Sequence, residues 1–398
     1  MKYKKSSLSI WSSKRAGAAV LATAALLAVS SPALAQATTG PVLPPSGGVV
    51  YVTNARSGDV SSLAIGPGAV LRPLGKPVST LGKFPRGIAL TPNGATAYVV
   101  NSDSDTLSVF RVGAQGALQP NPQIVQTGDE PWGATVSPNG RTLYVTNTGD
   151  RTISAYRIGL DGRPSKLGDF RATSDNPKQT VLSPDGRFLY LSYADVDETG
   201  DSPPRVITRF AVRLDGTLGP AQDVAKVGQA NFGIAISPDG GLVYVTSLVG
   251  QNVWAFRRGA DGSLTPVPGS PFPAPTGPVG LKVTPDGQHL YVASNDPDVD
   301  TAPGGLLGFT ILADGSLKPT PDSPVHTPDR AEVAAVAITP DGRDVFAAIR
   351  DTNQLAAFEI GAGGTLKEAT GSPFLTGGDR PLSQSIAVRP GPTPTTPQ

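Results

Sequence analysis

The chain has 398 residues, including 47 glycines and 40 prolines, and 38% of its residues are hydrophobic. This apolar content excludes a disordered chain, and so much Gly and Pro disfavours a helical protein. Without cysteine there is no disulfide, thiol nucleophile or thiolate metal site, and two histidines leave little material for a His-based centre. The composition therefore favours a large all-β fold with many turns.

Residues 1–35 have the pattern of a secretory signal peptide. Five basic residues precede an uncharged, largely apolar run at 16–29, and Ala33-Leu34-Ala35 follows as a small-x-small cleavage pattern. The run is short for a membrane span, so a membrane anchor is the alternative and Sec-type export the prediction. We expect a secreted protein, extracellular or in the cell envelope, with no membrane insertion after cleavage.

Removal of residues 1–35 changes the sign of the net charge. The full chain has 33 basic and 32 acidic residues, and this segment holds five of the basic ones and no acidic one, so −4 remains. A mildly acidic domain gives no support for nucleic-acid binding. We further expect a flexible segment at 36–47, a single domain at 48–390 and a disordered Pro/Thr tail at 391–398.

One unit repeats along residues 48–390. A Ser/Thr-Pro-Asp/Asn-Gly turn has its proline at positions 92, 138, 184, 238, 285 and 340, with a degenerate copy at Pro390. A short apolar segment precedes each turn, and a second one follows it, for example Tyr144-Val-Thr-Asn147. A third segment carries an aromatic residue, and a weaker fourth follows. Four short strands per 40–55 residues predict a β-propeller of four-stranded antiparallel blades.

The two ends of the repeat region complete each other. Residues 51–54 read as a second strand without a first, and residues 385–390 read as a first strand without a second. If both belong to one blade, pairing of the N- and C-terminal strands closes a ring of seven blades. Such closure hides the edge strands that an open array would expose.

The innermost strands predict a ring of residues at one mouth of the central channel. Six positions before each turn proline stand Arg86, Trp132, Lys178, Phe232, Val279, Ala334 and Gln384. Two cations and two aromatic rings suit a carboxylate, a lactone or a sugar acid, so we predict a ligand-binding funnel of Arg86, Trp132, Lys178, Phe232 and Gln384. The alternative is that these side chains only plug the channel.

Two acidic loops are predicted on the same face. Residues 193–205 contain Asp195, Asp197, Glu198 and Asp201, and residues 294–305 contain Asp296, Asp298 and Asp300. Carboxylates are ligands for calcium, so the six aspartates form a candidate calcium site, although neither loop has the full EF-hand spacing. The alternative is a pair of solvated acidic loops. No cofactor is otherwise required.

The repeats resemble those of known propellers. Tyr51-Val-Thr-Asn54 and Tyr144-Val-Thr-Asn147 are similar to the YVTN repeat of secreted propellers. Ser183-Pro-Asp-Gly-Arg-Phe-Leu-Tyr190 and Thr339-Pro-Asp-Gly-Arg343 resemble the seven-bladed lactonase family, which includes 6-phosphogluconolactonase and the carboxymuconate cyclases. The resemblance covers about residues 48–390 and implies the fold more specifically than the activity.

The resemblance also implies candidate catalytic residues. Asp150-Arg151 resembles the family's Asp-Arg, and Arg350 resembles its last arginine. Pro85-Arg86-Gly87 resembles the family's Pro-Arg-His, with Gly87 where the His stands, and no inner-strand His is found.

Two functions remain open. The first is a module that binds a small anionic or lactone-type ligand, or an extracellular protein, and is expected to be a monomer. The second is an extracellular lactonase or cyclase acting on a ring ester. In the second, Arg86, Lys178 or Arg350 would stabilise the oxyanion, while Glu198 or a loop aspartate would activate water.

Overall fold

The computed structural model describes residues 48–194, 205–294, 304–327, 331–350 and 352–391. The predicted signal peptide (1–35), the segment 36–47 and nearly all of the tail (391–398) lie outside these residues. Glu198 and all six aspartates of the candidate calcium site also lie outside them. Within the described residues, no helix is long and apolar enough to cross a membrane.

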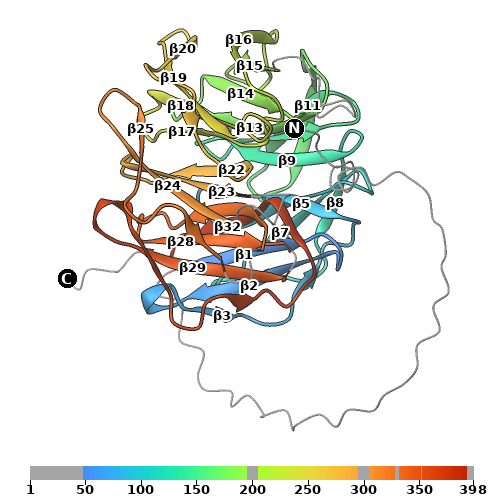
Figure 1. Cartoon of the computed structure of the whole chain (residues 1–398). Helices are drawn as coiled ribbons and strands as arrows, with labels where there is room; N and C mark the ends of the chain where they lie inside the picture. The colour runs from blue at the N-terminus through green and yellow to red at the C-terminus, as the bar shows by residue number, and fades with distance from the viewer. Residues whose placement is uncertain (1–47, 195–204, 295–303, 328–330, 351, 392–398) are drawn as a thin grey trace, which may run out of the picture. The chain divides into compact units, whose positions relative to one another are not determined.

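The described chain forms seven β-sheets, and the prediction of a seven-bladed, all-β propeller is confirmed (Figure 1). The first three complete blades are β5 (Pro85–Leu90), β6 (Thr96–Asn101), β7 (Thr106–Arg111) and β8 (Gln123–Gln126); β9 (Pro131–Val136), β10 (Thr142–Asn147), β11 (Thr152–Ile158) and β12 (Pro164–Arg171); and β13 (Pro177–Leu182), β14 (Phe188–Tyr193), β15 (Arg205–Ala211) and β16 (Gln222–Val227).

The next three blades have the same four-strand antiparallel path, and each gains a short fifth strand that pairs with its third. They are β17 (Ile234–Ile236), β18 (Leu242–Ser247), β19 (Asn252–Arg258) and β20 (Leu264–Pro266), with β21 (Phe272–Pro273); β22 (Pro278–Val283), β23 (His289–Ser294), β24 (Gly305–Ile311) and β25 (Leu317–Pro319), with β26 (Val325–His326); and β27 (Val333–Ile338), β28 (Asp344–Ile349), β29 (Gln354–Ile360) and β30 (Leu366–Glu368), with β31 (Phe374–Leu375).

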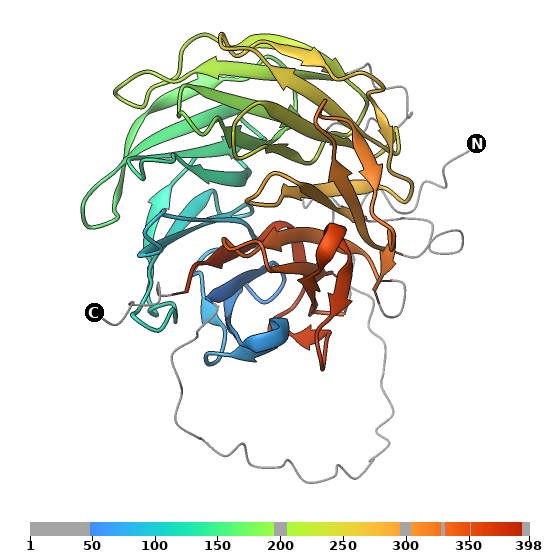
Figure 2. The same ribbon diagram turned by 90° about the vertical axis from the view of Figure 1, so that its left-hand side faces the viewer.

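The seventh blade, here called the split blade, joins the two ends of the domain. Its innermost strand is β32 (Pro381–Arg389), followed outward by β1 (Val49–Asn54), β2 (Asp59–Ile65) and β3 (Leu71–Pro73), with β4 (Val78–Ser79) on β2. Tyr51 pairs with Ala387 and Val52 with Ile386. Figure 2 shows these N-terminal strands in blue beside the C-terminal strands in red. The predicted closure is confirmed, and inner strands β27 and β5 contact β32 from either side.

The repeated turn motif has a local physical cause. In the copy at Ser183, the hydroxyl donates to Asp185 Oδ1 at 2.5 Å and accepts from the Phe188 N–H at 3.0 Å. Gly186 follows with φ +69°, a conformation that costs glycine little and other residues more. Two single-turn 3-10 helices, η2 (Pro67–Ala69) and η4 (Ala362–Gly364), lie elsewhere, between the outer strands β2 and β3 and between β29 and β30.

The hydrophobic core lies between neighbouring blades. Tyr98, Val100 and Leu107 of one blade, for example, pack against Leu143 and Val145 of the next. A tyrosine in six of the seven second strands also spans the gap between blades. Its hydroxyl donates to a glycine carbonyl in the outer turn of the following blade, in the pairs Tyr51–Gly116, Tyr98–Gly162, Tyr144–Gly216, Tyr190–Gly262, Tyr244–Gly315 and Tyr291–Gly364.

Candidate functional site at the channel mouth

Threonines of the second strands hold the inner strands at the mouth of the channel. Thr53 Oγ1 donates to the Arg86 carbonyl of the next blade at 2.5 Å, and Thr146 Oγ1 donates to the Lys178 carbonyl at 2.7 Å. In the three second strands that carry Tyr-x-Thr, at Tyr51, Tyr144 and Tyr244, Tyr thus binds the next blade at its outer turn and Thr binds it at the mouth. Arg86 and Lys178 consequently project from a rigid backbone ring.

Four of the predicted funnel residues come together as one cluster, here called the mouth cluster: Arg86, Trp132, Lys178 and Phe232. The Trp132 ring has the Arg86 guanidinium carbon 3.9 Å and Lys178 Nζ 3.6 Å from ring centroids. The Phe232 ring lies 6.5 Å from that of Trp132, tilted by 33°. All four residues are buried, and Trp132 is 1% exposed. Cation–π attraction is strongest where charge is desolvated, so these contacts stabilise the two buried cations.

Burial dominates the electrostatics of Arg86. Desolvation lowers its pKa to about 10, and the positive charge of Arg380 acts in the same direction. Glu130 and Asp103 oppose this shift, since their carboxylates favour the charged guanidinium. The Arg86 Nε and Nη1 atoms are buried and have no hydrogen-bond partner among the described residues. The mouth thus contains a charged donor whose hydrogen-bonding capacity is incompletely used.

The residues that flank Arg86 share a backbone feature that sequence reasoning missed. Phe84, Glu130 and Arg380 each stand before the proline that opens an inner strand, and each has a φ between +52° and +65°. Such left-handed backbone is uncommon outside glycine and is maintained by surrounding structure. At Phe84, which has this backbone conformation, the ring centroid lies 4.8 Å from the Arg86 guanidinium carbon. The sequence signal that could have revealed this feature is the proline that opens these inner strands, because the residue before each one takes the same backbone conformation.

The three other residues of the predicted ring, Val279, Ala334 and Gln384, are uncharged and not aromatic. Val279 and Ala334 are buried and apolar. Gln384 adopts a φ of +63° in the split blade, and its buried Nε2 atom has no hydrogen-bond partner among the described residues. Its side chain extends toward the channel interior, where it lines the cavity described below.

Arg350 belongs to a separate part of the mouth face. It follows β28, and its guanidinium forms an ion pair with Glu332, which precedes β27. The Arg350 N–H also donates to the Glu332 carbonyl at 3.0 Å, and the arginine is buried. The split blade lies between this pair and the blade of Arg86. Sequence reasoning missed Glu332, because only strand register places it beside Arg350.

The other residues that carry the family resemblance lie at the rim. Arg151 forms an ion pair of 2.7 Å with Asp175, with both side chains half exposed. Asp150 Oδ2 accepts from the Asp129 N–H at 2.7 Å. In the part of the chain that the structure describes, no group of three or more His, Asp or Glu side chains is arranged to hold a metal ion.

Comparison with known proteins agrees with this architecture. The family model described as "Lactonase, 7-bladed beta-propeller" matches residues 42–132, 128–200 and 234–383. A search of curated proteins found no relative of this chain by sequence.

Solved structures share the fold. A protein assigned as a 6-phosphogluconolactonase from Bacteroides uniformis is 21% identical, with a TM-score of 0.69 over 86% of this chain and 100% of that one. The periplasmic gluconolactonase PpgL of Pseudomonas aeruginosa is 19% identical, with a TM-score of 0.67 over 87% and 99%. Because the family model matches well over half of the sequence, the chain belongs to the seven-bladed β-propeller lactonase family.

Proposed function

We propose that this protein is exported and binds a small carboxylate- or lactone-type ligand at the channel mouth. The observation that carries the proposal is the Arg86 guanidinium, with two buried nitrogen atoms that have no partner among the described residues. Buried polar groups are nearly always paired, and an unmade hydrogen bond costs about 1–3 kcal/mol. A carboxylate or carbonyl oxygen of a ligand would accept these hydrogen bonds.

Arg380 is a second cation whose charge acts on Arg86. Its side chain is only partly buried, and its Nε also has no hydrogen-bond partner among the described residues. Two arginines that repel each other are stabilised together by one anion placed between them. Trp132 provides an aromatic wall and Lys178 further positive charge for the same ligand.

Export is supported by residues 1–35, with their basic start, apolar run and Ala-x-Ala ending. An exported propeller would meet ligands outside the cytoplasm, which favours unphosphorylated sugar acids and lactones over phosphosugars. A fold shared with a periplasmic gluconolactonase is consistent with this location.

Calorimetric titration tests the binding proposal. Purified protein is titrated with gluconate, and with glucose as an uncharged compound of similar size. We expect saturable binding of gluconate alone, weakened at least about tenfold in Arg86→Met because a charge-assisted hydrogen bond is lost. Lys83→Met, an exposed cation near the mouth, is the matched control and should leave affinity unchanged. Equal affinity of Arg86→Met and the parent protein would overturn the proposal.

A second candidate is hydrolysis of a lactone, favoured by family membership and by the Arg350–Glu332 pair. Glu332 would take a proton from water as the water attacks the carbonyl carbon, and Arg350 would stabilise the oxyanion. The ring C–O bond then breaks, and the proton passes to the leaving oxygen.

Ring opening of glucono-1,5-lactone, followed as acid release at constant pH, tests this candidate. We expect turnover above the spontaneous rate that Glu332→Gln abolishes, while Lys83→Met retains it. A rate equal to the uncatalysed one in the parent protein would exclude hydrolysis of this lactone and leave the binding proposal standing.

A further inference from the structure

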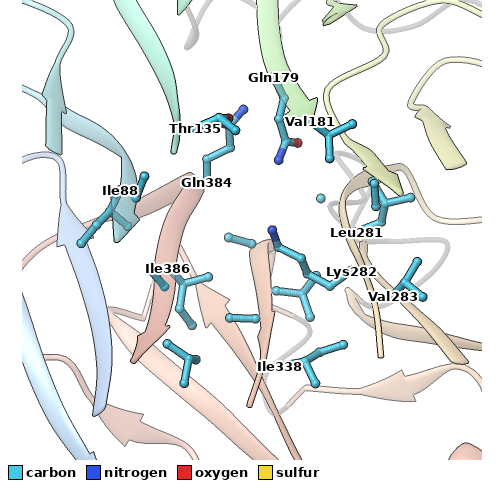
Figure 3. A pocket seen from close by; sticks show the side chains of 18 of the residues that line it. Ile88, Thr135, Gln179, Val181, Leu281, Lys282, Val283, Ile338, Gln384 and Ile386 are labelled. Carbon is cyan, nitrogen blue, oxygen red and sulfur yellow. The ribbon is translucent and has the colours of Figure 1, made fainter. Parts of the chain in front are cut away.

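The central channel contains a cavity of about 480 Å³ that is separate from the mouth cluster. All seven innermost strands contribute to its lining, which is mainly aliphatic (Figure 3). Val181, Leu281, Ile338 and Ile386 are among the wall residues, and Gln384 is the one residue of the mouth ring that lines it. This volume lies within the usual range for small-molecule sites.

Lys282 is the one charged side chain among the lining residues. It projects from β22 into the channel, and its side chain is exposed to the open space of the cavity although strands surround the channel. No ion pair or hydrogen bond of its side chain is found among the described residues. Burial lowers its pKa, and no carboxylate in the lining opposes this effect.

Smaller residues on the other strands leave space for this lysine. Three positions beyond the mouth ring, where Lys282 stands in its own blade, the other six blades carry Ala89, Thr135, Val181, Ala235, Ala337 and Ala387. A long cation at this level therefore extends into open space rather than into a packed core.

Two amides supply further donors in the same space. Gln384 Nε2 is buried and has no hydrogen-bond partner among the described residues. Gln179 accepts the Ile234 N–H through Oε1 at 3.3 Å, which leaves its amide nitrogen directed into the channel. In Figure 3 the Gln179 amide nitrogen and Lys282 Nζ point toward the same part of the cavity.

The cavity reaches the face that carries the repeated turns. Pro285 and Pro340 belong to those turns, line the cavity and are exposed. A ligand can therefore enter opposite the mouth cluster.

We propose that this channel binds an amphipathic monocarboxylate, with its carboxylate on Lys282 and the Gln179 and Gln384 amides and its apolar body against the aliphatic wall. One lysine and two neutral donors match a single negative charge, whereas a phosphate dianion would leave charge uncompensated in an apolar cavity. The aliphatic wall adds affinity in proportion to the apolar area that the ligand buries.

Titration with octanoate tests the proposal, alongside 1-octanol, which keeps the tail, and acetate, which keeps the charge. We expect saturable binding of octanoate, and much weaker binding of both comparison compounds. Lys282→Met should reduce octanoate affinity at least about tenfold, and Lys282→Arg should retain most of it. Lys318→Met, at an exposed lysine in the same blade, is the control and should change nothing.

A second measurement detects the proton that Lys282 takes up when the ligand binds. Desolvation favours the neutral amine of Lys282, so binding of a carboxylate at alkaline pH should be accompanied by proton uptake. Calorimetry detects this uptake as a binding heat that differs between buffers of different ionisation enthalpy. No other titratable side chain lines the cavity.

Lys282→Met should fold normally, since it removes a desolvated charge, and an unchanged circular dichroism spectrum checks this. Saturating octanoate should leave the affinity for gluconate unchanged in the parent protein, which keeps this site distinct from the mouth. Absence of octanoate binding, equal binding of octanol, or unchanged affinity in Lys282→Met would each overturn the proposal.

Discussion

Arg86 and Lys282 illustrate the same problem at the scale of single residues. Each is a cation held within protein, and for each the pKa is lowered first by burial. Contacts with the rings of Trp132 and Phe84 offset part of the cost of desolvating the Arg86 guanidinium. The Lys282 side chain has no such contact among the described residues and extends into the open cavity. Charges that reduce stability and are not paired internally are typical of binding sites. Both residues are therefore the points at which we place ligands.

Sequence reasoning identified part of this residue-level picture. Counting back from the turn proline identified Arg86, Trp132, Lys178 and Phe232, because every blade repeats the same inner strand. It did not identify Arg380, since the split blade has two extra residues between its opening proline and Gln384. Lys282 lay within a strand read only as apolar, and its isolation depends on six other strands.

Asp344 provides a pH-dependent prediction at this scale. It pairs across strands with Glu359, and burial first, then Asp341 and Glu359, raise its pKa to about 6. The folded state therefore favours the neutral acid, and stability associated with Asp344 is present at low pH and falls as pH rises from about 4 through 6.

Asp344→Asn should consequently have a higher Tm than the parent protein at pH 7, with the difference shrinking toward pH 4. Thermal unfolding followed by circular dichroism at both pH values measures this. A difference in Tm that is the same at pH 4 and pH 7 would contradict the raised pKa.

At the scale of elements, six of the seven second strands connect two blades through a tyrosine hydroxyl. Sequence reasoning placed these strands correctly, because most second strands follow a copy of the repeated turn and contain the same Tyr. The partners of these hydroxyls could not be predicted, since they lie in the next blade and depend on how the sheets pack. The pattern thus predicts strands directly and inter-blade contacts only after the ring is known.

Loss of one tyrosine contact should have a measurable cost. Tyr144 donates to the Gly216 carbonyl at 2.9 Å, and burial raises its pKa to about 12. Tyr144→Phe keeps the packing and leaves the carbonyl unpaired, so unfolding free energy should fall by about 1 kcal/mol in urea titrations. The blade with Phe346 at this position already lacks the hydroxyl and remains folded. An unchanged urea midpoint for the variant would show that the bond contributes nothing.

At the scale of the whole molecule, closure by the split blade determines the fold. The sequence predicted this closure because an unpaired second strand and an unpaired first strand stand at opposite ends of the repeats. Gly48 lies against Arg389 and Gly391, so the two ends of the described domain meet. The mouth and the channel both depend on closure, since β32 separates the blade of Arg86 from that of Arg350.

Deletion of residues 381–398 should therefore abolish cooperative folding, because it exposes β1, of which Tyr51 and Val52 are fully buried. A circular permutant that joins residue 391 to residue 48 and opens the exposed turn at Leu160 should keep the parent Tm. Scanning calorimetry compares the three proteins. A truncated protein that unfolds cooperatively at the parent Tm would show that closure is dispensable.

The central claim is that an anionic ligand binds beside Arg86 and Trp132. Trp132 can report this directly in a Trp11→Phe/Trp254→Phe background, which leaves it as the sole tryptophan of the three in the chain. Titration with gluconate should give a saturable change in Trp132 fluorescence, and Arg86→Met in the same background should lose it while Lys83→Met keeps it. A fluorescence spectrum unaffected by gluconate, or an identical response with and without Arg86, would contradict the assignment of the ligand site to the mouth.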